Sequence, residues 1–272
     1  MIHYHGGPIT PETVALKVWR ARHAMVSFAH PRQIELAASV CQSFALDNGS
    51  FSAWRAGQAV ADWSKYYQWC GCWLRHPGCD FALIPDVIDG GEEENDALLR
   101  EWPHKLCGVP VWHMHESIDR LVRLARNWPR VALGSSGQYA NIRTAQWWRR
   151  MSEVMVAVRG DDQFPICRLH GLRMLDPRVF ARLPIASADS TNVAQNVGID
   201  SAWKGTYMPR SRETRALVLA ERIEATNSAA KWRELSFASM DWLDHESEQP
   251  HSQELLKDVP SGKAGSHDLF SA

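Results

Sequence analysis

The sequence has no long apolar run, no marked net charge and no cysteine after Cys167. Its apolar residues occur in short runs, none of which approaches the roughly 18 residues that a membrane-spanning helix needs. The first residues, MIHYHGGPITPE, lack the apolar core of a secretory signal peptide. We therefore expect a cytoplasmic protein without membrane contact.

The charge balance excludes a general electrostatic attraction to nucleic acid. The chain carries 30 Lys and Arg against 31 Asp and Glu, a net charge of -1. Any nucleic-acid binding must therefore come from a local basic patch. The six cysteines are irregularly spaced, which is typical of reduced thiols in the cytosol rather than of a disulfide framework.

Short apolar runs alternate with segments of helical period, which is the pattern of repeated βα units around a parallel sheet. We predict strands at 2–5, 25–29, 44–46, 81–84, 109–113, 131–133, 166–169 and 185–188. We predict helices near 11–22, 32–41, 52–74, 92–105, 117–127, 140–157 and 176–182. Eight strands with intervening helices predict an α/β fold, the (β/α)₈ TIM barrel.

The predicted barrel domain covers residues 1–200. A short helical C-terminal addition follows at 201–244, with helices at 211–226 and 228–243. The segment 245–272 is rich in polar residues and has few large apolar ones, so we expect a disordered tail there.

Two aspartates follow predicted strands at the end where a TIM barrel holds its active site. Asp47 follows the third strand, and Asp189 follows the eighth. Two carboxylates over one pocket can break and remake a glycosidic bond, one as nucleophile and one as proton carrier. The structural alternative is that each aspartate only caps the helix after it.

Several segments resemble those of the tRNA-guanine transglycosylases, in the same order along the chain. Asp47-Asn48-Gly49-Ser50-Phe51 is similar to their Asp-Ser-Gly-Gly-Phe box, and Asp189-Ser190 to the segment that carries their nucleophile. The segments similar to their base-binding residues lie between these two, at Asp86, Gly134-Ser135-Ser136-Gly137 and His170-Gly171.

The opening Tyr4-His5-Gly6-Gly7-Pro8-Ile9, the box at Asp47 and Pro85-Asp86-Val87 look closest to the DpdA family. These relatives place 7-deazaguanines in DNA, in phages and bacterial modification islands. The resemblance implies that Asp189 attacks C1′ of a guanine nucleotide and that Asp47 carries the proton. It implies a substrate-binding group made of Asp86, Asn48, Gly134, Ser135, Ser136, His170 and Gly171.

The chain departs from the tRNA enzymes in two places. It has no cysteines for their C-terminal zinc site, and Thr191-Asn192-Val193-Ala194-Gln195-Asn196 replaces their Arg-rich nucleophile loop. These departures favour DNA as the polymer, with tRNA as the alternative, and a free 7-deazaguanine such as preQ0 as the second substrate. No cofactor is expected for catalysis. The sequence leaves open a homodimer, partner modification enzymes and, for a phage protein, a host cytoplasm.

Basic residues after Asp189 are candidates for phosphate contacts. They are Lys204, Arg210, Arg212 and Arg215, and the structural alternative is a solvated helix face.

Two further patterns in the sequence indicate metal-binding sites. Cys70, Cys72, His76 and Cys79 have ligand types that suit a structural zinc, although their spacing is not a standard one. A second pattern resembles metal-dependent amidohydrolases, which implies a different class of enzyme. It consists of His3, His5, His113, His115, His170 and Asp189.

Overall fold

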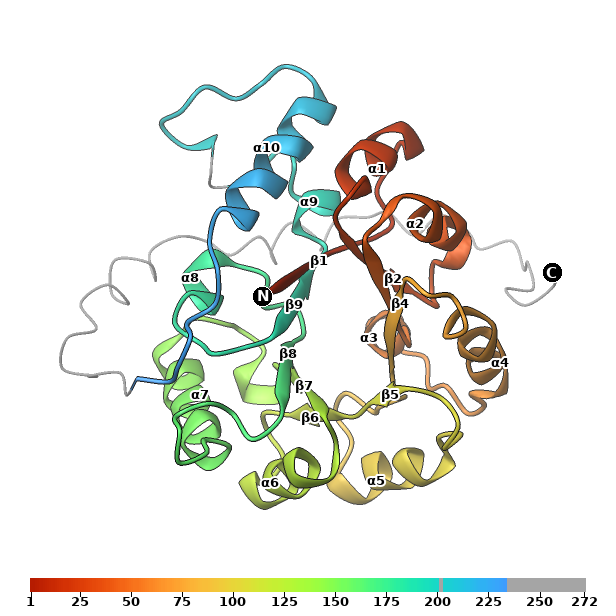
Figure 1. The fold of residues 1–272 in the computed structure, drawn as a ribbon, viewed down its shortest axis with the longest axis vertical. Helices are drawn as coiled ribbons and strands as arrows, with labels where there is room; N and C mark the ends of the chain where they lie inside the picture. Colours follow the sequence, from red (N-terminus) through yellow and green to blue (C-terminus); the bar gives the residue numbers. More distant parts are fainter. Residues whose placement is uncertain (201–202, 234–272) are drawn as a thin grey trace. The chain divides into compact units, whose positions relative to one another are not determined.

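Parallel strands form a nearly closed barrel with helices around its outside (Figure 1), which confirms the predicted TIM-barrel class. The structure is a computed structural model that describes residues 1–200 and 203–233. Within these residues the strands are β1 (Ile2–Gly6), β2 (His23–Ser27), β3 (Ser43–Asp47), β4 (Cys79–Leu83), β5 (Gly108–Val109), β6 (Val111–His113), β7 (Arg130–Gly134), β8 (Arg168–Gly171) and β9 (Ser187–Ser190). Each of the eight predicted runs overlaps an observed strand, at bounds shifted by a few residues at most.

The predicted fifth strand, 109–113, is broken into β5 and β6 at Pro110. The sheet order runs from β5 through β4, β3, β2, β1, β9, β8 and β7 to β6. Proline has no N–H to donate, but its carbonyl accepts a hydrogen bond from the Ala132 N–H at 2.9 Å. Because β5 pairs with β4 and β6 pairs with β7, the two halves of this strand complete the ring.

Helices cover the outside of the barrel between the strands. Their bounds are α1 (Glu12–Trp19), η1 (Pro31–Gln33), α2 (Ile34–Val40), α3 (Ser50–Arg55), α4 (Ser64–Trp73), α5 (Glu92–Glu101), α6 (Ile118–Asn127), η2 (Gly137–Tyr139), α7 (Ala145–Ala157), α8 (Pro177–Phe180), α9 (Asn192–Gln195) and α10 (Arg212–Glu224). The single helix predicted at 52–74 is wrong, because the structure has two helices there. Gly57, with φ of +68°, ends the first of them in the left-handed conformation that glycine adopts without strain.

The C-terminal prediction is confirmed in one part and wrong in another. The predicted helix 211–226 is α10, which packs against α1 and α9 beside the barrel (Figure 1). The predicted helix 228–243 is wrong over residues 228–233, whose backbone is not helical. Its remainder and the predicted tail at 245–272 lie outside the described residues. Within the described part of the chain, no helix is long and apolar enough to cross a membrane.

The lumen of the barrel is packed with side chains. It holds Tyr4, Met25, Ala45, Phe81, Leu83, Val109, Val111 and Ala132. At the amino ends of the strands, the Tyr4 hydroxyl donates to Asp80 Oδ2 at 2.6 Å, and Arg130 Nη1 donates to the same oxygen at 2.9 Å. The Arg130 guanidinium lies 4.5 Å from the centre of the Phe81 ring. These contacts close the amino end, so the carboxyl end is the side of the lumen where a substrate can approach.

Removing the Tyr4 hydroxyl tests this closure. We expect Tyr4→Phe to lower the free energy of unfolding by about 1–2 kcal/mol, because a buried hydrogen bond to a charged group is removed. Urea unfolding measures the change. Tyr207→Phe is the matched control, since Tyr207 is 77% exposed and its substitution should change almost nothing. Equal effects of the two substitutions would contradict this account of the closed end.

Candidate active site at the carboxyl ends of the strands

The alternation of side chains along the strands turns both predicted catalytic aspartates into the lumen. Ala45 of β3 belongs to the lumen cluster, and Asp47 lies two residues further along the same face. Asp189 of β9 is paired in register with Tyr4 of β1, another lumen residue. The structure therefore brings the two carboxylates together at the carboxyl end of the barrel.

The surroundings of Asp47 favour its neutral form. Burial is the largest cause, and together with the negative charges of Asp189 and Asp86 it raises the pKa of Asp47 to about 6. Two hydrogen bonds act in the opposite direction, one from the Ser27 hydroxyl and one from the Gly49 N–H at 3.2 Å. A carboxyl group with this pKa can both donate and accept a proton near neutral pH.

Asp189 is held through one oxygen atom. Its Oδ1 accepts a hydrogen bond from the backbone N–H of Arg173 at 3.1 Å. His170 Nε2 lies 3.3 Å from the same oxygen, and His170 Nδ1 is bonded to the Ser187 hydroxyl at 2.8 Å. Among the described residues, these contacts leave Asp189 Oδ2 without a hydrogen-bond partner. The carboxylate is thus oriented through Oδ1, and none of these contacts engages the lone pairs of Oδ2.

Asp86 is the centre of a buried polar network. Asn48 Nδ2 donates to Asp86 Oδ1 at 2.8 Å, and His113 Nε2 lies 2.8 Å from Asp86 Oδ2. Asn48 also donates to the Ile84 carbonyl at 2.9 Å and accepts from the Ser50 N–H at 2.8 Å. The predicted residues Asn48 and Asp86 are therefore joined. His113 is the partner that the transglycosylase resemblance missed. In the sequence it stands out as a strand-end residue and as a member of the amidohydrolase pattern.

The predicted serine loop is engaged with the protein itself. The Ser135 hydroxyl accepts from Trp147 Nε1 at 2.9 Å. His115 Nε2 lies 3.0 Å from the Gly90 carbonyl, which needs a donor, so His115 Nδ1 accepts from the Ser136 hydroxyl at 2.8 Å. The two glycines of the predicted group allow close packing. A Cβ on Gly134 would lie 2.9 Å from His113 Nδ1, and one on Gly171 would lie 2.8 Å from Met174 Cβ.

The first two histidines of the amidohydrolase pattern point away from the lumen. Tyr4 lies in the lumen, so the neighbouring residues of β1 face the helices outside. His3 Nε2 is 2.9 Å from the Thr226 carbonyl, and His5 Nε2 is 2.9 Å from Glu224 Oε1 of α10. The expectation that His3 and His5 share a site with Asp189 is wrong.

The four possible zinc ligands do not form a group. Cys70 and Cys72 are two positions apart on α4, which places them on different sides of the helix. Cys70 is buried and Cys72 is exposed, while His76 Nδ1 accepts from the Gly78 N–H at 3.1 Å. Among the described residues, no three His, Cys, Asp or Glu side chains lie together in a way that could hold a metal ion.

The predicted phosphate-binding residues lie on the chain that follows β9. Arg212 Nη2 donates to the Ala194 carbonyl of α9 at 3.1 Å, and Arg215 Nη1 donates to the Pro209 carbonyl at 3.5 Å. Lys204 and Arg210 are exposed. Two of the four predicted residues thus donate to backbone carbonyls, and the other two are exposed.

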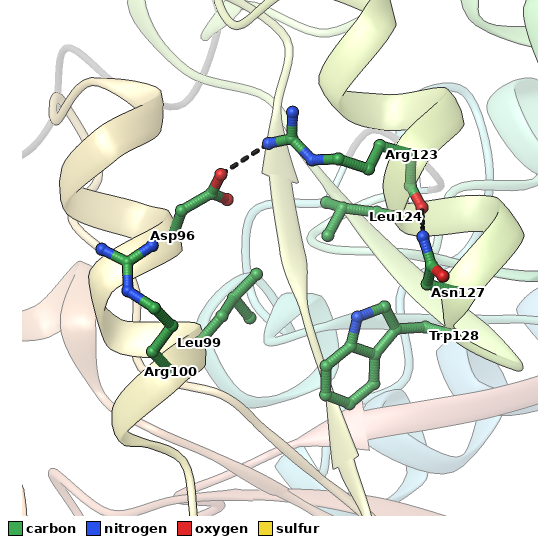
Figure 2. Close-up of a pocket in the computed structure, with 7 residues that line it drawn as sticks. All are labelled: Asp96, Leu99, Arg100, Arg123, Leu124, Asn127 and Trp128. Carbon is green, nitrogen blue, oxygen red and sulfur yellow. Dashed lines mark hydrogen bonds and ion pairs between the residues drawn. The ribbon is translucent and has the colours of Figure 1, made fainter.

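A pocket on the outer surface lies between α5 and α6 (Figure 2), and neither Asp47 nor Asp189 lines it. It is lined by Asp96, Leu99, Arg100, Arg123, Leu124, Asn127 and Trp128. Figure 2 shows Asp96 and Arg123 facing each other across it, where they form an ion pair. None of the predicted site residues lines this pocket.

The candidate site is characterised by its geometry alone. The chain matches no protein-family model, no curated protein and no solved structure. Its distinguishing feature is two carboxylates in unequal surroundings at one end of the lumen. Asp47 has a raised pKa, and Asp189 is fixed by a backbone N–H and approached by a histidine.

The raised pKa of Asp47 gives a prediction about stability. A folded-state pKa of about 6, above the unfolded value near 3.9, means that the folded protein holds this proton more tightly. Ionisation of Asp47 therefore costs stability that is lost progressively as the pH rises from about 4 to about 6. We expect Asp47→Asn to raise the free energy of unfolding by about 1–3 kcal/mol at neutral pH, and by little near pH 4.

Urea unfolding at several pH values measures this difference. Asp119→Asn is the matched control, because Asp119 is exposed on α6 and the same chemical change there removes no buried carboxyl group. A stability difference for Asp47→Asn that stays constant across this range would refute the assignment of the raised pKa.

Proposed function

We propose that this protein is a guanine transglycosylase that exchanges guanine in DNA for a 7-deazaguanine such as preQ0. The observation that supports this most directly is the pair of lumen-facing carboxylates in unequal surroundings. Two titratable groups whose environments differ in this way are suited to different roles in one reaction. The order of the resembling segments along the chain supports the same reaction.

In the first step, Asp189 Oδ2 attacks C1′ of the target nucleotide. The C1′–N9 bond breaks, its electron pair goes to the base, and Asp47 donates a proton to the departing guanine. A covalent bond between Asp189 and C1′ remains. The backbone N–H of Arg173, bonded to Oδ1 at 3.1 Å, orients the carboxylate for this attack.

In the second step, the 7-deazaguanine replaces guanine. Its N9–H gives a proton to the ionised Asp47 as N9 attacks C1′, and the bond to Asp189 breaks. Asp47 is thereby protonated again and Asp189 is released as a carboxylate, so no cofactor or energy source is consumed. The pKa of about 6 allows Asp47 to serve in both directions.

Asp86 is the group proposed to read the guanine-like edge of either base. Asn48 and His113 hold one carboxylate oxygen each, which fixes the position of the group. A carboxylate has about four lone-pair sites, so both oxygens can still accept hydrogen bonds from a base. The target base must leave a duplex to reach this depth of the lumen.

Exchange of labelled guanine tests the proposal. We expect the full chain to incorporate labelled guanine into DNA and to form a denaturant-resistant adduct with it. Asp189→Ala should abolish both, and Asp47→Asn should slow exchange roughly 10²–10⁴-fold because the proton carrier is removed. Asp119→Asn is the control and should exchange normally. Undiminished exchange by Asp189→Ala would refute the nucleophile, and exchange into tRNA alone would identify RNA as the polymer.

The pH dependence of the separate half-reactions is a further prediction. Release of guanine needs protonated Asp47, so its single-turnover rate should fall as the pH rises through about 6. Addition of 7-deazaguanine to the isolated adduct needs ionised Asp47, so that rate should rise over the same range. Rapid quench of each half-reaction measures both. Identical pH profiles in Asp47→Asn and the parent would contradict its role.

A further inference from the structure

Two arginines follow strands at the carboxyl end of the barrel, the end that holds the two proposed catalytic aspartates. Arg55 ends α3, the helix that follows the Asp47 segment. Arg173 follows β8 and donates its backbone N–H to Asp189 Oδ1. Its φ of 60° is uncommon for a residue other than glycine, so the backbone there is held in place by its surroundings. Arg173 is therefore positioned relative to Asp189.

The two guanidinium groups are near each other. The guanidinium of Arg173 lies 4.4 Å from the centre of the Phe51 ring, and Phe51 is on α3 with Arg55. Desolvation is the largest cause that lowers the pKa of Arg173, and the charge of Arg55 lowers it further, against the effect of Asp189. Among the described residues, no ion pair holds either guanidinium. Arg173 thus lies near both the like charge of Arg55 and the carboxylate of Asp189.

A pair of guanidinium groups with unsatisfied donors suits an anion that carries several acceptor oxygens. A phosphodiester meets this requirement, and it is the only charged group of a DNA strand. In a nucleotide whose C1′ reaches Asp189, the phosphates on either side of that sugar lie within the reach of a long side chain anchored beside the nucleophile.

We propose that Arg173 and Arg55 bind the phosphodiester next to the nucleotide that reacts with Asp189. The inference rests on the proposed function for the identity of that nucleotide. This site is separate from the basic residues at 204–215, which lie on the chain after β9. The competing explanation is that Arg173 only covers the Phe51 ring and contributes to packing.

Binding of single-stranded DNA tests the site without requiring turnover. The probe is a short fluorescein-labelled oligonucleotide with one guanine, and binding is followed by anisotropy over a range of KCl concentrations. All proteins carry Asp189→Asn, which prevents the covalent intermediate and keeps an oxygen to accept from the Arg173 N–H. Arg173→Gln and Arg55→Gln are compared with Arg100→Gln, an exposed arginine of the outer pocket shown in Figure 2.

We expect Arg173→Gln and Arg55→Gln each to weaken binding about 3–10-fold and to reduce the salt slope by about 0.7 for each phosphate that is no longer neutralised. Arg100→Gln should change neither quantity. Arg173→Lys should bind more tightly than Arg173→Gln, because it keeps the charge. The proposal is overturned if Arg173→Gln and Arg55→Gln bind like Arg100→Gln. Arg55 and Arg173 are both exposed, and the Arg55 variant gives a result of its own even where Arg173→Gln lowers the melting temperature.

A neutral methylphosphonate in the oligonucleotide locates the phosphate that the arginines bind. Placed beside the guanine, it should weaken binding by the parent protein and have little further effect on Arg173→Gln or Arg55→Gln. Placed at the far end, it should have the same small effect on every protein. Equal effects of the two placements would overturn the site. An RNA oligonucleotide of the same sequence shows whether the sugar matters, and equally weakened binding of RNA by the variants supports an interaction with phosphate.

The two proposals can fail separately. If the parent exchanges no base into DNA or tRNA while the arginine variants bind DNA more weakly as expected, the phosphate site stands and the transglycosylase is wrong. If exchange occurs and the arginine variants bind DNA as tightly as the control, the phosphate site alone is wrong.

Discussion

The alternation of side chains in a closed parallel barrel is the constraint on which the rest of this structure depends. Every second residue of each strand must enter the lumen. In the middle of the barrel these positions carry Tyr4 and Phe81, and Asp80 and Arg130 close the packing below them at the amino end. At the carboxyl ends the same alternation turns polar side chains such as Asp47 and Asp189 into the lumen. The packed lumen therefore supports the candidate site and limits it to one end of the barrel.

The site has a cost in stability that its proposed chemistry explains. A carboxylate as desolvated as Asp47 weakens the folded state when it is ionised, and an asparagine there would avoid this cost. Proteins commonly give up stability at positions where function needs an unfavourable group. The Asp86 network is different in kind, because Asn48 and His113 compensate its burial through hydrogen bonds to both oxygens.

Much of the barrel could be predicted because strand length and polar strand ends are local features. It was harder to predict which face of its strand a side chain occupies. Period two correctly indicates that His3 and His5 share a face, but it does not say which face, and Tyr4 between them occupies the lumen. The break at Pro110 and the division of the helix at 52–74 depend on single residues. The pairing of His113 with Asp86 joins separate strands, which no local pattern reports.

In the proposed reaction, chemistry and polymer binding are coupled through the backbone. The backbone N–H of Arg173 donates to the proposed nucleophile, and its guanidinium lies over the Phe51 ring. The position of the N–H therefore limits where the guanidinium can reach. A side-chain substitution at this residue keeps the N–H, and therefore separates the two contributions in a way that a deletion in the loop could not. Arg55, which ends α3, likewise follows Asp47 in the chain. A nucleotide held by both arginines would therefore be aligned with both carboxylates at once. Alignment of this kind is what a base exchange requires, since the sugar must stay in place while one base leaves and another enters.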